Sequence, residues 1–184
     1  MTECGKTVLG CVTGRFQPVH EQHLELFGIA LASCEHLIVA VTNPDTDAYH
    51  REPESAHRHT TAANPFTYVE RAMLLAAALS GRGMADRATI VPFDLTRPRV
   101  WAQYVPESAR QFVRAYSDWE REKAVRLRAY YEVTLLDGEE AGRVSASDIR
   151  AAMRDGADWR GLVPAATVPL LEGLLAARPM RERT

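Results

Sequence analysis

Two histidines and their neighbours are the residues whose types and spacing best suit chemistry. His20 and His23 close the segment 14–23, which also holds Arg15. If a helix begins near His20, imidazoles three residues apart lie on the same side of its first turn. Backbone N–H groups without a partner inside the helix, and the positive end of the helix dipole, favour an anion there. The segment therefore predicts a phosphate-binding cradle.

Two other interpretations of the histidine pair stay open. The pair is compatible with metal ligation, but a zinc site takes four ligands, and in the sequence no cysteine or carboxylate has zinc-site spacing from these histidines. The pair is also compatible with partly exposed histidines that have no chemical role. The flanking pattern favours the phosphate cradle, because the pair follows a strand at the place where open α/β sheets bind ligands.

A buried strand and an amphipathic helix are needed to hold this segment. Residues 7–12 form a short apolar run, which is typical of a strand buried on both faces. Gly14 permits a tight exit from that strand, and Pro18 suits a turn or the first residue of a helix. After the histidines, apolar residues recur at helical spacing, namely Leu24, Phe27, Leu31 and Cys34.

The rest of the chain repeats the same alternation of strand and helix. Further strands are expected at 36–42, 88–95, 111–116 and 131–136, with helices between them. Strand, helix and strand in this order imply right-handed crossovers and a parallel sheet. We expect one domain over residues 1–184, an α/β Rossmann-like three-layer sandwich. Its central parallel sheet has about five strands, with helices on both faces.

Two later helices begin with capping signals. Thr67 and Glu70 have the spacing of a capping box, and Val69, Met73, Ala76 and Leu79 are expected to face the core. Ser145 and Asp148 repeat the capping pattern at 144–150, a segment that ends with Arg150. A capping box explains both of its members structurally. It does not explain Arg150, whose planar guanidinium suits phosphate oxygens.

Composition and charge bound the function. The chain has 184 residues, a formal net charge of -2 and three cysteines without spaced pairs. It lacks both the basic patch expected of a nucleic-acid binder and an apolar run long enough to span a membrane. The alternating charges at 120–128 are typical of a solvent-facing helix. We therefore expect a cytoplasmic protein with reduced thiols and neither a nucleic-acid nor a membrane partner.

The polar stretch 45–63 is expected to form a mobile surface loop. It contains His50, His57 and His59, and a triple-histidine metal site is one interpretation of them. The alternative is a lid that orders over substrate and brings Arg58 or His59 to a phosphate.

Four segments of the chain resemble one enzyme family. Residues 14–23, 64–71, 144–150 and 158–164 are similar, in this order, to motifs of nucleotidyltransferases related to archaeal-type nicotinamide mononucleotide adenylyltransferase. The similarity runs with gaps over nearly the whole chain. It implies the transfer of a nucleoside monophosphate from a triphosphate to a small phosphorylated acceptor, with Mg²⁺ carried by the nucleotide phosphates. The family often forms oligomers, so a homo-oligomer stays open.

The resemblance implies roles for individual residues. It assigns catalysis to His20, His23, Arg15 and Arg150. It assigns nucleotide binding to Thr13, Gly14, Phe16, Gln17, Ser145 and Ser147. It assigns acceptor binding to Asn43, His59, Arg71 and Trp101. At the position of Trp101, the family's tryptophan stacks on the nicotinamide ring. Filling the core is the other interpretation of Trp101.

Two positions depart from the family pattern. Gln22 replaces the glycine of His-x-Gly-His, and Pro98 replaces an asparagine that contacts the carboxamide. ATP with nicotinamide mononucleotide is the leading substrate pair. The alternative is CTP, or another triphosphate, with another small phosphate or phosphonate. A catalytically silent nucleotide sensor is the third hypothesis.

Overall fold

The computed structural model describes residues 7–46, 60–139 and 141–177. The strands are β1 (Thr7–Gly14), β2 (Cys34–Thr42), β3 (Ala88–Phe93), β4 (Arg110–Ala115) and β5 (Val133–Asp137). The α-helices are α1 (Glu21–Ser33), α2 (Tyr68–Gly81), α3 (Asp118–Arg128), α4 (Ala146–Asp155) and α5 (Val168–Ala177). Short 3₁₀ segments are η2 (Thr61–Ala63), η3 (Ala85–Arg87), η4 (Pro98–Gln103), η5 (Arg160–Leu162) and η6 (Ala165–Thr167). Strands and helices thus alternate through most of the described chain.

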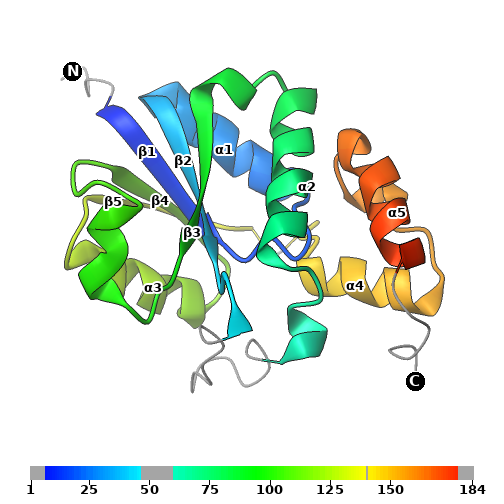
Figure 1. Ribbon diagram of the computed structural model, residues 1–184. Coiled ribbons are helices and arrows are strands. Elements are labelled where there is room, and N and C mark those ends of the chain that lie inside the picture. The colour runs from blue at the N-terminus through cyan, green and yellow to red at the C-terminus, as the bar shows by residue number, and fades with distance from the viewer. Residues whose placement is uncertain (1–6, 47–59, 140, 178–184) are drawn as a thin grey trace.

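The strands form one parallel sheet in the order β3-β2-β1-β4-β5. The chain builds outward from β1 through β2 to β3, then returns to the other side of β1 for β4 and β5 (Figure 1). The order therefore reverses between β1 and β4. In open parallel sheets, the carboxyl ends of the strands at such a point leave a crevice that binds ligands.

Helices cover both faces of the sheet. Helices α1 and α2 pack on one face, with α4 and α5 beside them, and α3 packs on the other (Figure 1). Alternate residues of a strand point to opposite faces, and β2 follows this rule. Leu37, Val39 and Val41 belong to the first core cluster, whereas Ile38 and Ala40 belong to the second. The expected three-layer α/β sandwich is confirmed.

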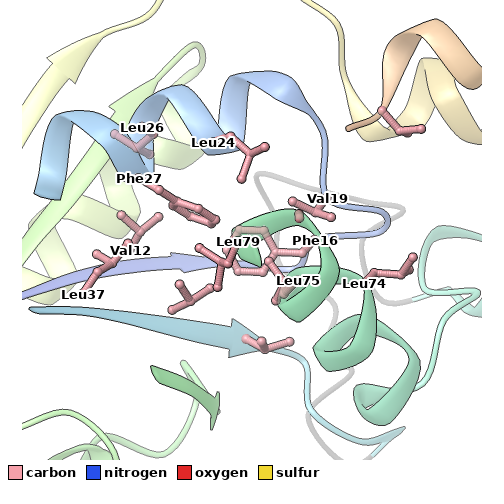
Figure 2. Close-up of a cluster of buried hydrophobic side chains, with 14 of the residues drawn as sticks. Val12, Phe16, Val19, Leu24, Leu26, Phe27, Leu37, Leu74, Leu75 and Leu79 are labelled. Carbon is pink, nitrogen blue, oxygen red and sulfur yellow. The ribbon is translucent and has the colours of Figure 1, made fainter. Parts of the chain in front are cut away.

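The turn after β1 is anchored by its own apolar side chains. Figure 2 shows Phe16 and Val19 lying among the leucines of α1 and α2. Phe16 is 2 % exposed and Val19 is fully buried. The ring centroid of Phe16 lies 5.7 Å from that of Phe27 in α1. Close packing on several elements fixes the path of the turn before any ligand binds.

The expected capping boxes are present at both helices. Thr67 is the N-cap of α2 and exchanges hydrogen bonds with Glu70. Ser145 and Asp148 do the same at α4. Local sequence alone specifies these two helix starts, because each box involves residues only three apart.

The predicted core face of α2 is wrong at three of its four positions. Val69 and Met73 are 63 % and 50 % exposed, Ala76 is also exposed, and only Leu79 is buried. The buried face consists of Arg71, Leu74, Leu75, Ala78 and Leu79. A helix rich in alanine and leucine offers two apolar stripes, and the correct one contains an arginine, which sequence patterns assign to the surface.

Two smaller expectations also need correction. Cys34 is not helical, because α1 ends at Ser33 and Cys34 opens β2. In α3 the charges mostly face solvent as expected, but Glu120 and Lys123 are only 9 % and 8 % exposed.

Gly14 gives the turn after β1 the space that it needs, since a Cβ there would lie 2.8 Å from the Phe16 ring. The positive φ of this turn, 50°, falls on Phe16.

Cys11 and Cys34 are buried free thiols, whereas Cys4 lies outside the described residues. Within the described ranges, none of the helices combines the length and the apolar character needed to cross a bilayer.

Candidate active site

A cavity of about 480 Å³ opens at the carboxyl ends of β1 and β4, where the strand order reverses. Two walls enclose it. The motif wall comprises the lining residues from 12–26 and 143–148, and the α3 wall comprises those from 112–123. Residues of the segments 14–23 and 144–148, more than 100 residues apart in the chain, therefore share one cavity.

His20 and His23 lie side by side on the motif wall. Their ring centroids are 3.7 Å apart, and His20 is the N-cap of α1. The backbone N–H of His20 donates to Nδ1 of His23 over 3.2 Å. Because Nδ1 is the acceptor, a neutral His23 carries its proton on Nε2. Nδ1 of His20 is buried and has no hydrogen-bond partner among the described residues, so a ligand can supply one.

Burial in the cavity favours the neutral form of both histidines. Burial, assisted by the positive charge of Arg143, lowers the pKa of His20 to about 4. Burial also lowers the pKa of His23 well below its ordinary value, and His20, Lys123 and Arg114 act in the same direction. Neutral imidazoles beside a polyanion act as hydrogen-bond donors and not as fixed positive charges.

The start of α4 faces the same cavity. Ser145 and Asp148 bond each other as the N-terminal cap, and these bonds lower the pKa of Asp148, whose carboxylate accepts from the side chain and the backbone of Ser145. Arg150 does not line the cavity. Its Nη1 donates to the carbonyl of Gln17 over 2.8 Å and its Nη2 to Oγ of Ser147 over 2.9 Å. The arginine thus connects the two motifs.

The charged side chains around the cavity are mostly positive. Within the described part of the chain, four cations line it, Arg15, Arg114, Lys123 and Arg143, against the two carboxylates of Glu120 and Asp148. Each carboxylate accepts hydrogen bonds inside a capping box. A cavity with this charge and with the starts of α1, α3 and α4 in its wall suits a polyanion.

The remaining predicted nucleotide-binding residues also line the cavity, but several bond the protein. Gln17 is 1 % exposed and exchanges two hydrogen bonds of 2.9 Å with the backbone of Phe66. Phe16 packs against the ring of His23 at 4.9 Å. Thr13 and Gly14 end β1, and the buried Oγ1 of Thr13 has no hydrogen-bond partner within the described ranges. Arg15 donates to the carbonyl of Ala63 over 3.3 Å.

The predicted acceptor-binding residues lie elsewhere. Asn43, Arg71 and Trp101 are not among the cavity-lining residues of the described chain, and His59 lies outside the described residues. Arg71 is completely buried and donates to four backbone carbonyls, those of Arg15, Thr42, Asn43 and Thr67. It therefore holds together the carboxyl ends of β1 and β2 and the start of α2.

Trp101 fills the second core cluster. It is 2 % exposed, stacks on Phe93 with ring centroids 5.2 Å apart, and donates from Nε1 to the carbonyl of Asp94 over 2.7 Å. This is the position expected from the core-filling interpretation.

Sequence reasoning missed the α3 wall. Its chemical groups include Arg114, Tyr116, Trp119 and Lys123, none of which belongs to a recognised motif. A signal for Lys123 was present, because it shares the buried face of α3 with Ala124 and Leu127. Arg143 lies two residues before the capping box of α4 and belongs to no motif, so the sequence did not predict its role. In the structure its guanidinium lies 4.4 Å from the centre of the Tyr116 ring.

The donor set fits a metal ion that arrives with its ligand. No cluster of three or more histidine, cysteine or acidic side chains with metal-site geometry occurs within the described ranges. Because both carboxylates of the cavity already cap helices, phosphate oxygens would have to supply the ligands of a hard cation such as Mg²⁺.

A family model and two relatives match most of the chain. A model of the cytidylyltransferase-like family matches residues 11–152. The chain is 34 % identical over 165 residues to phosphonoformate cytidylyltransferase of Streptomyces viridochromogenes, covering 89 % of this chain and 90 % of that protein. It is 28 % identical over 156 residues to nicotinamide-nucleotide adenylyltransferase of Thermococcus onnurineus, covering 84 % and 77 %.

Solved structures share the fold. Two structures of a bifunctional NMN adenylyltransferase/ADP ribose pyrophosphatase from Francisella tularensis match with TM-scores of 0.68 and 0.65 at 15 % and 16 % identity. Each match covers 91 % of this chain but only about half of the other, 50 % and 49 %. The second structure is complexed with AMP and a manganese ion. Together with the family match over most of the chain, these findings show that the chain belongs to the cytidylyltransferase-like family and is a nucleotidyltransferase.

Proposed function

We propose that this enzyme transfers a nucleoside monophosphate from a nucleoside triphosphate to an oxygen of a small phosphorylated or phosphonate acceptor. The observation that carries the proposal is the cavity in which His20 and His23, at the start of α1, meet the start of α4. The N-termini of α1 and α4 and four cationic side chains of the described residues surround one cavity, which suits the negative charge of a triphosphate.

The reaction is an in-line displacement. An oxygen of the acceptor attacks the α-phosphorus, the bond from that phosphorus to the bridging oxygen breaks, and pyrophosphate leaves. The acceptor brings its own nucleophile, so catalysis consists of positioning and charge stabilisation. Nε2–H of His23 donates to the oxygens of the α-phosphate as their charge grows, and His20 and Arg15 assist it.

Arg150 positions the triphosphate indirectly. By bonding the carbonyl of Gln17 and Oγ of Ser147, it fixes both phosphate-binding segments relative to each other. Ser145 keeps the first N–H groups of α4 directed at the cavity through its capping box. A Mg²⁺ ion held by the phosphates would neutralise charge on the leaving pyrophosphate.

Two substrate pairs follow from the relatives and from particular residues. ATP with nicotinamide mononucleotide is supported by the archaeal relatives and by the segment 64–71. CTP with a small phosphonate is supported by the 34 % identical relative. A specific observation favours this second pair. Trp101 and Arg71, which the resemblance assigns to binding of the nicotinamide acceptor, are buried and donate hydrogen bonds to backbone carbonyls of the protein.

Pyrophosphate release with a panel of four triphosphates tests the proposal. Each triphosphate is combined with nicotinamide mononucleotide, phosphonoformate and simple phosphate monoesters, with Mg²⁺ present. Transfer predicts pyrophosphate release with at least one combination, and the productive combination identifies the pair. Binding of a triphosphate without release in any combination would instead identify a nucleotide sensor and refute the transfer.

A further inference from the structure

Lys123 differs from the other cations of α3. Arg121, Arg126 and Arg128 are exposed, as on an ordinary surface helix, whereas Lys123 is 8 % exposed and lines the cavity. Its Nζ donates to the backbone carbonyl of Thr13, at the end of β1, over 3.1 Å. Lysine is seldom buried, because removal of an ammonium from water is costly unless polar groups compensate. Lys123 thus presents a buried ammonium at the cavity wall, held there by the end of β1.

A second buried polar atom lies at the same strand end. Oγ1 of Thr13 belongs to a residue that is 4 % exposed, lines the cavity and has no hydrogen-bond partner among the described residues. Such orphaned groups are rare in folded proteins and mark places where a ligand or water bonds. The carbonyl of Thr13 holds Lys123, and its hydroxyl offers a hydrogen bond of its own.

The surface beside Lys123 is aromatic. Nζ of Lys123 is 5.4 Å from the centre of the Trp119 ring, and both residues line the cavity with Phe112 and Tyr116. The ring of Tyr116 is held in place, since Arg143 covers it at 4.4 Å and a Cβ on Gly138 would come within 2.4 Å of it. Aromatic rings stack on nucleobases with little dependence on sequence, so this wall suits the planar part of a nucleotide.

The other parts of a nucleotide are accounted for on the motif wall. There, the histidines and the starts of α1 and α4 take the phosphates. We infer that the α3 wall selects the nucleobase: the ring of Trp119 stacks on it, and the ammonium of Lys123 donates to a carbonyl oxygen of the base. This inference rests on the proposed function and separates ATP from triphosphates whose base carries a carbonyl oxygen, CTP among them.

A donor-only group discriminates between bases. Lysine has three N–H donors and no acceptor. Cytosine offers a carbonyl oxygen beside a ring nitrogen, whereas adenine has no carbonyl oxygen. Lys123 should therefore favour CTP over ATP, which agrees with the second substrate pair.

Calorimetric titration of the full chain with CTP and ATP, each with Mg²⁺, tests the assignment without requiring turnover. In Lys123→Met, affinity for CTP should fall roughly 10- to 100-fold, the usual effect of losing a hydrogen bond to a charged group. Affinity for ATP should change less than about threefold, since adenine leaves that bond unmade. Arg128→Met, an exposed cation on the same helix, is the matched control and should change neither.

Further variants keep the test decisive. Lys123→Arg retains a donor and should keep part of the preference for CTP, which also covers the case in which the methionine variant fails to fold. Trp119→Leu should weaken both nucleotides by about tenfold, because stacking does not depend on the base.

Equal loss of CTP and ATP in Lys123→Met would make Lys123 a phosphate contact and overturn the inference. Unchanged binding of both in a folded variant would make it a scaffold residue, with the same consequence. Selective loss of CTP binding in an enzyme that releases no pyrophosphate would support the inference while refuting the transfer reaction.

Discussion

The cavity has two walls of different origin. The motif wall consists of a strand-to-helix turn and a capped helix start, and its polar groups come from short segments of recognisable sequence. The α3 wall comes from a strand end and the inner face of a helix, and its groups are spread over 12 positions, 112–123. The first wall suits phosphates, which are common to all nucleotides. The second suits the part of the substrate that varies. If this division is correct, variants of the motif wall affect all triphosphates alike.

His23→Ala should have the largest effect. Loss of one transition-state donor typically lowers kcat by roughly 10²-fold or more, and the reduction should be the same for each triphosphate. Single-turnover rates with saturating triphosphate measure it. His36→Ala, a histidine on β2 that bonds Thr89, is the control and should retain the rate. Near-normal turnover of His23→Ala would remove its assigned role.

Acid should have the second largest effect, because it lowers the free energy of unfolding through His20 on the motif wall. Folding lowers the pKa of His20 from 6.5 to about 4, so below pH 6.5 the unfolded chain binds the proton first and stability falls. Between pH 7 and pH 5 the loss should be about 2 kcal/mol for this residue. Urea unfolding at both values measures it. In His20→Gln this part of the pH dependence should vanish, and an unchanged slope would contradict the neutral state assigned to His20.

Arg150→Lys should have a moderate effect. The guanidinium spans Gln17 and Ser147 with two nitrogens, and an ammonium on a flexible stem does not reproduce that fork. We expect kcat/KM to fall about tenfold, as for the loss of roughly 1.4 kcal/mol, with every triphosphate. Arg154→Lys on the exposed side of α4 is the matched control. A loss confined to one triphosphate would break the division between the walls.

Gln22→Gly should have the smallest effect. Nε2 of Gln22 donates to the carbonyl of Gly142 over 3.3 Å, next to Arg143, and the bond is exposed to solvent. Its removal should change KM by about two- to fivefold, as expected for a weak neutral hydrogen bond. Initial rates over a range of triphosphate concentrations measure the change. A fall in kcat/KM as large as that of His23→Ala would show that the bond from Gln22 to Gly142 is essential to the site.

The two walls also differ in how far the sequence predicts them. The strand-turn-helix at His20 and the capping boxes at Thr67 and Ser145 depend on neighbours three or four residues away, so a local pattern suffices. The start of α3 has a capping box as well, Ser117 with Glu120, but the chemical groups of the α3 wall form no recognised motif. Helical spacing puts Lys123 on the same face as Ala124 and Leu127, and the packing of α3 on β4 turns that face inward.

Arg71 and Trp101 also show that a local pattern does not determine the role of a side chain. The resemblance assigns both residues to acceptor binding, whereas in the structure Arg71 bonds four carbonyls and Trp101 fills the core. Asn43, placed beside them by resemblance, has a φ of 50° and gives its carbonyl to Arg71. Residue identity did not distinguish a ligand contact from a scaffold contact, because the N–H donors of arginine can bond either phosphate oxygens or backbone carbonyls.

By itself, the sequence determined the alternation of strands and helices, the parallel sheet and the helix starts near His20, Thr67 and Ser145, since these follow from short-range periodicity and capping. Tertiary structure alone decided which face of α2 is buried, which cations line the cavity and which residues hold the scaffold. Those outcomes depend on contacts between residues far apart in the chain, and the cost of burying a charge or a polar atom is settled only when every neighbour is in place.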